Sequence, residues 1–599
     1  MSASKPASFI PICRDDMNER GWDECDFIFV SGDAYVDHPS FAATLLCRVL
    51  ENAGFRVGII PQPDWKETSS YTVLGRPRLG FLVGAGNMDS MVAHYTAAKK
   101  KRSDDAYTPG GKSRTSHEWP GRPDRATLVY VEGIRRAYKD AAVIIGGIEA
   151  SLRRFAHYDY WSDNVRRSIL LDSKADILVY GMGEKPLLRI AKRLAAEEKI
   201  SNIRNEKGTC VRVNGKKITD ITGDIEQWEN IVQLPGYETV REKDDASLRE
   251  YIKHFMTQKQ NSDPLTAKPL AEKNDGDRWV IQNPPALPLL TNELDKLYEL
   301  PFTRKAHPIY TKAGGINALK EVSFSLVSSR GCYGGCSFCA ITNHQGRAVT
   351  GRSKESLVRE ARDITARFPS KGSDGFKGYI HDAGGPTANF FRPACEKQKQ
   401  GGFCVDRECL YPDPCPKLKA NHREYLQTLD ALRKIPDIKK VFIRSGIRFD
   451  FIQHDIQYGN EFLETLCRHH ISGQLKVAPE HVSANVLDAM GKNTNASVYE
   501  QFKKDFTAIN KKLGLKQYLL PYFISAHPGA GTKEAAELAQ YLKKTGFTPE
   551  QSQEFYPTPG TMSTVMYYTG YDPRTMKPIY AARGDKERRK QKELISIKK

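Results

Sequence analysis

The sequence predicts an α/β protein with two α/β domains, a Rossmann-like N-terminal domain and a partial TIM-type β/α barrel. Short apolar runs of strand length alternate with segments of helical spacing along most of the chain. Parallel strands covered by helices are the economical arrangement for such runs. With 599 residues, 40% of them hydrophobic, the chain is also long enough to bury sizeable cores.

Residues 1–200 are expected to form the Rossmann-like domain. A strand at 26–30, a helix at 41–53 and a strand at 54–60 make the first βαβ unit. A strongly basic, Gly- and Pro-rich stretch from Lys99 to Arg125 is expected to be a long surface loop. Further buried strands of the same sheet are predicted at 79–83, 142–145 and 177–180.

The rest of the chain divides into three parts. Charged stretches and prolines break the periodicity of residues 201–315, which are expected to be an irregular connecting segment. Residues 316–585 are expected to form the barrel, and 586–599 a basic disordered tail. The predicted barrel strands are 322–327, 378–381, 440–444, 474–477 and 517–524, with helices at 353–368, 423–434, 460–469 and 499–513.

Composition and charge exclude several classes of protein. No apolar stretch reaches the 18 residues of a membrane span, and the N-terminus lacks the apolar core of a secretion signal. We therefore expect a cytoplasmic protein with no membrane partner. With 90 Lys and Arg against 72 Asp and Glu, the net charge of +18 fits either an anionic partner such as nucleic acid or an ordinary solvated surface.

The twelve cysteines are too few for a disulfide scaffold, and seven of them lie between Cys332 and Cys415. Three of these, Cys332, Cys336 and Cys339, follow a predicted strand with the spacing C-x3-C-x2-C, and we call them the cysteine trio. Glycines between them let the backbone wrap around a compact object. Thiolates suit zinc or iron–sulfur clusters. A structural zinc ion needs four ligands, for example with Cys395 as the fourth, whereas three thiolates leave one position open.

With Phe338 before the last cysteine, the trio resembles the signature of radical S-adenosylmethionine (SAM) enzymes. The surrounding sequence resembles one group among them, the YgiQ-like radical SAM proteins of uncharacterised function. The resemblance extends over nearly the whole chain and weakens only after about residue 585. The stretches that carry it include 32–40, 87–91, 102–111 and 146–151.

The resemblance implies a radical SAM barrel in which the cysteine trio holds three irons of a [4Fe–4S] cluster. SAM would bind the fourth iron, with Phe338 near its adenine. A one-electron reductant would then drive cleavage of SAM and hydrogen abstraction from an unknown substrate. Asp382, Gly384 and Gly385 stand where the family's Gly-Gly-Glu motif contacts the methionine amino group, but no Glu follows the glycines here. By position, Ser445, Arg448, Lys476 and Glu480 are further candidates for binding SAM.

Four more cysteines, Cys395, Cys404, Cys409 and Cys415, lie in a proline-rich insertion at 395–415, and we call them the second cysteine set. Four thiolates close a metal site, so either a structural zinc ion or an auxiliary iron–sulfur cluster fits. The alternative is four reduced cysteines in a stiff loop.

The N-terminal domain resembles the cobalamin-binding domain of some radical SAM proteins. The cobalamin-ligand motif Asp-x-His-x-x-Gly is missing, however, since Asp37-His38 has neither the spacing nor the glycine.

Two functions from different classes compete. The preferred hypothesis is a radical SAM enzyme acting on an unknown substrate, with RNA as one candidate. The alternative is a zinc-stabilised nucleic-acid-binding protein without catalysis, which requires zinc and no iron at both cysteine sets.

Overall fold

The computed structural model describes residues 8–113, 119–223, 225–370, 375–546 and 552–595. The chain separates into two compact units. Unit 1 comprises Met1–Leu287 and Leu300–Ser323, and unit 2 comprises Pro288–Glu299 and Phe324–Lys599.

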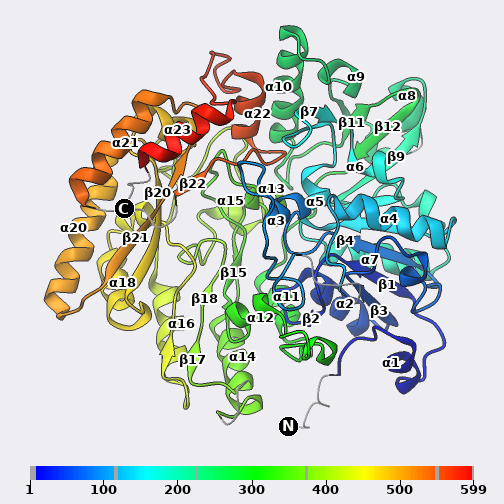
Figure 1. The fold of residues 1–599 in the computed structure, drawn as a ribbon, viewed down its shortest axis with the longest axis horizontal. Helices are drawn as coiled ribbons and strands as arrows, with labels where there is room; N and C mark the ends of the chain where they lie inside the picture. Colours follow the sequence, from blue (N-terminus) through cyan, green and yellow to red (C-terminus); the bar gives the residue numbers. More distant parts are fainter. Residues whose placement is uncertain (1–7, 114–118, 224, 371–374, 547–551, 596–599) are drawn as a thin grey trace. The chain divides into compact units, whose positions relative to one another are not determined.

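Within the described residues, unit 1 is built on one sheet of nine strands in the order β10-β11-β12-β9-β8-β5-β4-β1-β3 (Figure 1). The five strands from β8 to β3 run parallel to their neighbours. The α/β class expected from the sequence is thus confirmed. The bounds of these five strands are β1 Phe27–Ser31, β3 Val57–Pro61, β4 Gly80–Gly84, β5 Val143–Gly146 and β8 Ile177–Val179.

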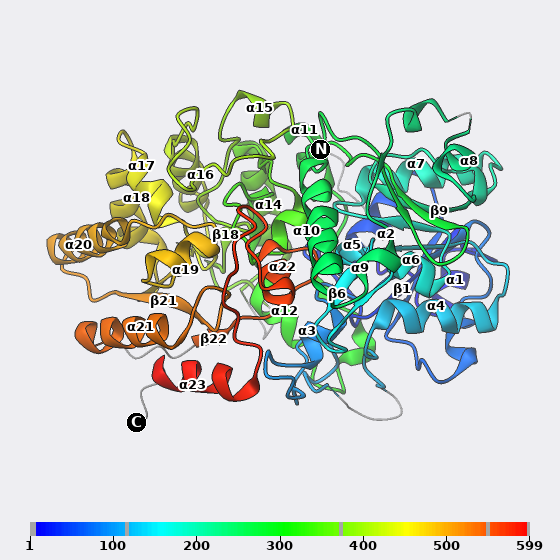
Figure 2. The same cartoon turned by 90° about the horizontal axis from the view of Figure 1, so that it is seen from above.

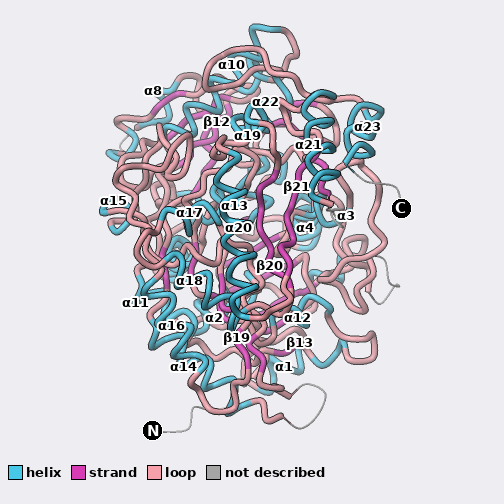
Figure 3. Tube along the Cα trace, turned by 90° about the vertical axis from the view of Figure 1, so that its left-hand side faces the viewer, coloured by secondary structure: helices cyan, strands magenta, loops and turns pink. Residues whose placement is uncertain are grey.

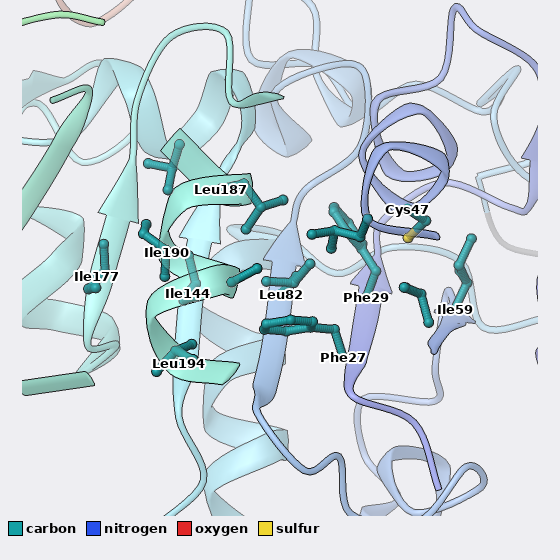
Figure 4. Close-up of a cluster of buried hydrophobic side chains, with 14 of the residues drawn as sticks. Phe27, Phe29, Cys47, Ile59, Leu82, Ile144, Ile177, Leu187, Ile190 and Leu194 are labelled. Carbon is teal, nitrogen blue, oxygen red and sulfur yellow. The ribbon is translucent and has the colours of Figure 1, made fainter. Parts of the chain in front are cut away.

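The parallel strands are apolar throughout because both faces of the sheet are buried. On β1, Phe27 and Phe29 join one hydrophobic cluster, while Ile28 and Val30 join another. Successive side chains of a strand point to opposite faces, so the two clusters are the two cores of unit 1. Figure 4 shows the first cluster, to which α2 contributes Cys47 and α7 contributes Leu187, Ile190 and Leu194. The covering helices are α2 Ala42–Asn52 and α7 Glu184–Ala195 on this face, and α4 Ala126–Ala137 and α6 Ile169–Ser173 on the other.

The segment expected to be irregular, 201–315, is largely part of unit 1. Its strands β9, β11 and β12 extend the sheet in antiparallel fashion, and β10 adds a parallel edge. Beyond residue 300, β13 pairs with β2 of the same unit. The bounds of these elements are β2 Val36–Asp37, β9 Thr209–Asn214, β10 Val232–Gln233, α10 Asp245–Gln260, β11 Leu270–Lys273, β12 Arg278–Gln282, β13 Lys305–Ala306 and α12 Asn317–Val322.

Unit 2 repeats strand and helix. Most of its strands pair in parallel, namely β14 with β18, β17 with β19, β20 with β21, and β21 with β22, while β15 and β16 pair antiparallel. A parallel bridge between Ile447 and Val477 links the β19 segment to β20. Parallel strands paired in chain order are the pattern of a β/α barrel. Figure 3 shows the long strands β20 and β21 side by side. The strands are β14 Leu326–Val327, β15 Ser329–Arg330, β16 Thr350–Gly351, β17 Tyr379–Ile380, β18 Ala383–Gly384, β19 Lys440–Val441, β20 Gln474–Glu480, β21 Tyr518–Ser525 and β22 Ser552–Glu554.

Four helices between these strands lie close to the predicted positions, and they are α14 Lys354–Arg367, α16 Arg423–Arg433, α18 Gly459–Thr465 and α20 Ala496–Leu513. Helix α21 Thr532–Thr545 was not predicted. The strand expected at 322–327 is shorter, because Val322 ends helix α12 and β14 begins only at Leu326.

The chain end differs from the expected disordered tail over 586–595. Helix α23 (Asp585–Ile595) lies beside α21 in Figures 1 and 2. Arg588, Gln591 and Ile595 recur at helical spacing and are buried. Gln591 donates to the carbonyl of Ala530 at 2.7 Å, and Ile595 packs in a cluster with residues of β21 and α21. Two polar side chains therefore complete the buried face of a helix that composition alone does not reveal. Residues 596–599 lie outside the described residues.

Candidate metal and cofactor site

The cysteine trio lies on an irregular loop between β15 and the short helix α13 (Ile341–Gln345). Gly331, just before the trio, has a φ of 82°, and a Cβ there would lie 2.1 Å from the carbonyl oxygen of Ala348. Gly335 has a φ of 65°, and its Cβ would meet the Glu408 carboxylate at 2.1 Å. The loop thus requires glycine at both positions.

The three thiols of the trio lie within electrostatic reach of one another. Burial raises the pKa of Cys336, and Cys332 raises it further against the lowering effect of Arg448 and Lys492. Burial, followed by the other two thiols, raises the pKa of Cys339 to about 12. Such thiols ionise only where a cation, for example a metal centre, compensates their charge.

Arg448 is the cation in direct contact with the trio. Its Nη1 atom donates to the sulfur of Cys336 at 3.6 Å, and its Nε and Nη2 atoms hold the carboxylate of Asp450. A Cβ on Gly334 would lie 2.7 Å from Nη1, so the glycine makes room for this contact. Burial raises the pKa of Asp450, but the neighbouring Arg448 charge outweighs it and lowers the pKa.

Glu480 and Lys492 complete the charged surroundings of the trio. Lys492 donates to the carbonyl of Ala478 and lies 3.4 Å from one carboxylate oxygen of Glu480. The other oxygen, Oε2, is buried and has no hydrogen-bond partner in the described part of the chain. Glu480 has a φ of 67°, uncommon for a non-glycine residue, at an irregularity where β20 ends. Its charge raises the pKa of both Cys336 and Cys339.

Asp382 and the glycines after it hold a second turn of unit 2. The Asp382 carboxylate accepts from the backbone N–H groups of Arg444, at 2.8 Å, and Ser445, at 3.2 Å, and from the Ser445 hydroxyl. A Cβ on Gly384 would meet that hydroxyl at 2.6 Å, and one on Gly385 would meet the Ser329 hydroxyl at 2.7 Å. The carboxylate of Asp382 is thus already occupied by the turn after β19.

Two other candidates have different surroundings. Phe338 is half-buried, and its ring meets the ring of His527 edge-on, with centroids 6.0 Å apart. Lys476 is exposed, on the face of β20 opposite the buried Leu475 and Val477. Among the described contacts, none joins Lys476 to the cysteine trio.

Several residues at this site carry no sequence signal. Lys492 lowers the pKa of Cys336, and Asp450 holds Arg448 beside it, although both residues are remote from the motif in sequence. Thr387 lies 3.5 Å from the sulfur of Cys332. The buried hydroxyls of Ser328 and Ser329 have no hydrogen-bond partner within the described residues. Such small polar side chains could have been suspected only from their place right after β14.

The second cysteine set is gathered only in part. Burial raises the pKa of Cys409 to about 12, with Cys395 and Cys415 among the charges that act on it. Cys404 is exposed. Cys409 also accepts a hydrogen bond from Gln398 at 3.5 Å. For the described residues of the whole chain, no group of three or more His, Cys, Asp or Glu side chains is arranged to hold a metal ion.

Tyr333 lies between the two cysteine sets. Burial raises its pKa, and Cys409 and Cys332 both raise it further. Its ring stacks on Phe390 with centroids 3.8 Å apart, within a hydrophobic cluster that both of these cysteines contact. An aromatic side chain therefore lies close to both Cys332 of the trio and Cys409 of the insertion.

A cavity of about 520 Å³ adjoins the same charges. Arg448, Asp450 and Lys492 line one part of it, and Tyr499 and Tyr541 line another. The cation that contacts Cys336 is therefore also reached from this cavity.

Two family models and several curated relatives match this chain. A family described as radical SAM N-terminal matches residues 9–325, and a domain of unknown function matches residues 550–599. The UPF0313 protein of Clostridium botulinum strain 657 is 51% identical over 589 residues, 98% of this chain and 88% of the relative. The UPF0313 protein of Clostridium perfringens strain 13 is 51% identical over 590 residues, 98% of this chain and 85% of the relative.

The chain belongs to the UPF0313 family of radical SAM proteins. The resemblance inferred from the cysteine motif and its surroundings is confirmed. Within the described residues of this UPF0313 protein, no helix is long and apolar enough to cross a membrane.

Two solved structures are similar to this UPF0313 protein at low identity. The radical SAM methyltransferase TsrM from Kitasatospora setae, with tryptophan and a SAM analogue bound, is 14% identical with a TM-score of 0.46, covering 89% of this chain and 74% of its own. The cobalamin-dependent radical SAM enzyme OxsB, with aqua-cobalamin bound, is 12% identical with a TM-score of 0.47, covering 92% and 56%.

Cobalamin, which the resemblance of the N-terminal domain raised, does not fit the residues of unit 1. The Asp37 carboxylate is buried against Arg48, and His38 is buried against Arg304 at 3.0 Å. Neither side chain is available to a ligand.

The carboxyl end of the sheet, where β1 meets β4 and an open α/β sheet binds its ligands, is filled as well. Arg122 is buried there and pairs with Asp33 at 3.0 Å and Asp105 at 3.1 Å. Its Nη1 atom donates to the carbonyl of Ala85 at 3.0 Å. A Cβ on Gly86 would lie 2.1 Å from the Asp33 carboxylate, so the segments are in direct contact.

Proposed function

We propose that this protein is a radical SAM enzyme, in which the cysteine trio binds a [4Fe–4S] cluster and SAM binds the cluster's open position. The observation that carries the proposal is the hydrogen bond from the buried Arg448 to the sulfur of Cys336. Three soft ligands beside a fixed cation suit a cluster that carries negative charge. When bound, the cluster and SAM supply the one-electron cleavage of a carbon–sulfur bond, which generates a radical able to abstract hydrogen from the substrate.

In this proposal the residues around the trio have distinct roles. Arg448 and Lys492 offset the charge of the thiolates, and Asp450 fixes the guanidinium of Arg448. Glu480, whose Oε2 atom has no partner among the described residues, would accept a hydrogen bond from the ammonium group of bound SAM. The missing Glu of the Gly-Gly-Glu motif is thus replaced by a carboxylate from the end of β20.

Asp382 acts indirectly, because its carboxylate is occupied by the turn that carries Ser445. It positions that turn while Gly384 and Gly385 let β18 approach it closely. Phe338 would border the adenine of bound SAM, and Lys476 has no role in this site.

The experiment is anaerobic reconstitution with iron and sulfide, followed by reduction with a low-potential one-electron donor in the presence of SAM. The wild type is expected to bind about four irons at the trio. It is also expected to form 5′-deoxyadenosine, measured by mass spectrometry, whereas Cys336→Ala forms none. Cys467→Ala is the matched control, because Cys467 is a buried thiol outside both cysteine sets. Equal product from Cys336→Ala and Cys467→Ala contradicts the proposal.

We further propose that the second cysteine set binds a metal, either an auxiliary iron–sulfur cluster or zinc. The support is that Cys395 and Cys415, in the same loop, both raise the pKa of the Cys409 thiol. Because metal binding couples to local folding, Cys404 is expected to move in to complete the set. Metal analysis of Cys409→Ser beside Cys467→Ser tests the second metal site. Only Cys409→Ser should lose metal, and whether the lost metal is iron or zinc distinguishes a cluster from a zinc ion.

The same metal analysis decides the alternative function. A zinc-stabilised nucleic-acid-binding protein requires zinc at both sets and no iron.

All twelve cysteines are free thiols in the structure, which supports a reducing, cytoplasmic location.

A further inference from the structure

The turn between Cys336 and Cys339 is held from outside through both backbone polar groups of Ser337. The N–H of Ser337 donates to the carbonyl of Met490 at 2.8 Å. Its carbonyl accepts from the N–H of Ser563 at 2.9 Å, on helix α22 (Met562–Thr569). A loop that contains three of the chain's glycines and little regular structure is thus fixed by two distant segments of unit 2.

A buried histidine fixes the second of these segments. The Nδ1 atom of His527 lies 2.7 Å from the carbonyl oxygen of Pro528, and Nε2 lies 2.7 Å from the hydroxyl oxygen of Ser563. Because a carbonyl only accepts, Nδ1 carries the proton and Nε2 accepts from the Ser563 hydroxyl. Ser563 therefore donates twice, once to His527 and once to Ser337.

The imidazole also contacts the turn itself. The ring of His527 meets Phe338 edge-on at a centroid distance of 6.0 Å, and it meets Phe555 at 5.0 Å. Phe338 lies between the second and third cysteines, and its ring is the side chain of the turn that contacts this imidazole. His527 is fully buried, which lowers its pKa to about 3 and keeps it neutral.

The same segment holds the chain on the other side of Cys339. Asn343, on α13, donates from Nδ2 to the carbonyl of Gly560 at 2.6 Å. Gly560 and Ser563 thus hydrogen-bond to the chain on both sides of the third cysteine of the trio.

Another contact from the C-terminal segment reaches the cysteine-rich insertion. Arg574 hydrogen-bonds to the hydroxyl of Tyr411, which in turn donates to Asp488 at 2.6 Å. Arg574 also pairs with Asp488 directly at 2.9 Å. Asp488 stands two residues before Met490, the partner of the Ser337 N–H.

We propose that His527 and Ser563 are positioning residues for the cysteine trio, and that the C-terminal region around α22 is the closing part of the cofactor site. The region matched as a domain of unknown function thereby sets the geometry of Ser337 and Phe338 and, through them, of two cysteine ligands. This inference rests on the proposed function, because the geometry matters only if the trio binds a cluster to which SAM is presented.

The test compares three variants of the full-length reconstituted protein. Ser563→Ala removes the hydroxyl that binds His527, whereas Ser563→Thr keeps it. Thr569→Val is the matched control, because it removes another buried hydroxyl of α22, one that bonds within its own helix end. Iron content, thermal unfolding, the electron paramagnetic resonance spectrum of the reduced cluster with and without SAM, and 5′-deoxyadenosine are measured for each.

We expect Ser563→Ala to keep its iron but to lose the change that SAM produces in the resonance spectrum, with about 10- to 100-fold less 5′-deoxyadenosine. Ser563→Thr should keep both properties, and so should Thr569→Val, whatever its loss of thermal stability. If Ser563→Ala fails to fold, His527→Phe removes the same hydrogen bond from the imidazole side, and His527→Gln, whose amide oxygen can still accept from the Ser563 hydroxyl, is its conservative control.

The outcomes separate the two proposals. A wild type that binds no iron or forms no 5′-deoxyadenosine overturns the proposed function. A wild type that does both, beside a Ser563→Ala variant that matches Thr569→Val in spectrum and product, overturns the positioning role alone.

Discussion

The guanidinium of the buried Arg448 bridges the sulfur of Cys336 and the carboxylate of Asp450. One nitrogen faces the trio, at 3.6 Å from the sulfur, and two others face Asp450. A charge that serves the cofactor site is therefore also half of a buried ion pair. Substitutions at the two residues separate these roles.

Arg448→Met is expected to destabilise unit 2 by about 3–5 kcal/mol, because it leaves the carboxylate of Asp450 buried without its partner. The double variant Arg448→Met with Asp450→Leu should recover most of that stability in urea unfolding. Its reconstituted cluster should nonetheless have a lower reduction potential than that of the wild type, since a hydrogen bond and a cation beside a sulfur favour the reduced state. A wild-type potential in the double variant would show that Arg448 serves only the fold.

Glu480→Gln is expected to weaken SAM binding to the reconstituted protein about tenfold to a hundredfold. The reason is that a hydrogen bond to a charged group contributes about 1.5–3 kcal/mol. Equilibrium binding of SAM measures the change. Glu464→Gln is the control, because its partly exposed carboxylate pairs only with Arg468 and Lys512 among the described ion pairs. Equal affinities for the two variants would remove Glu480 from the SAM site.

Acid is expected to destabilise unit 2 before its carboxylates titrate. Burial lowers the pKa of His470 and His481 to about 4 and that of His527 to about 3. The unfolded chain, in which histidine titrates near 6.5, takes up protons that the folded chain cannot. The contribution of these neutral histidines to the free energy of unfolding is therefore complete above about pH 6.5. It is lost as the pH falls toward 4. Urea unfolding at a series of pH values should show this slope, and His481→Gln should flatten it; parallel slopes would refute the assignment.

Helix α23 is expected to be a folded part of unit 2. Ile595→Ala should cost about 2–4 kcal/mol in the free energy of unfolding, because Ile595 is 1% exposed among Phe523, Leu538 and Leu542. Leu594→Ala, at a neighbouring side chain that is 38% exposed, should change it by less than about 0.5 kcal/mol. Similar small effects from both variants would mean that the helix is not packed in solution.

The ion network of Arg122 should be a large contributor to the stability of unit 1. Arg122→Met is expected to cost about 3–5 kcal/mol, because it strands Asp33 and Asp105 in the interior. Arg76→Ala breaks an exposed ion pair with Asp140 and should cost less than about 1 kcal/mol. Chemical denaturation followed by circular dichroism gives both values. A mild effect of Arg122→Met would show that water reaches the network.

The parallel strands of unit 1 were predictable because each is a continuous apolar run buried on both faces. The later strands of its sheet were not. Glu272 interrupts the apolar pattern of β11, yet it is fully buried, since its carboxylate meets His254 at 2.7 Å. That partner lies on α10, and nothing in the local sequence announces the pairing.

The trio could be located from its spacing alone, because all three cysteines lie within eight consecutive residues. Its surroundings come from remote segments: Lys492 and Ser563 reach the loop through tertiary structure. Asp382 was expected to contact the cofactor. Its carboxylate oxygens instead accept hydrogen bonds from one hydroxyl and two N–H groups of the turn after β19. Sequence position gives the strand end on which a residue lies, but the competition for its hydrogen bonds is decided in three dimensions.

The buried ion cluster of Arg122 also constrains how the sequence of unit 1 can change. Because Arg122 pairs with both Asp33 and Asp105, a neutral residue at any one of these three positions leaves a buried charge without a partner. A tolerated replacement must therefore change the three charges together, so these positions are coupled although they are far apart in the sequence.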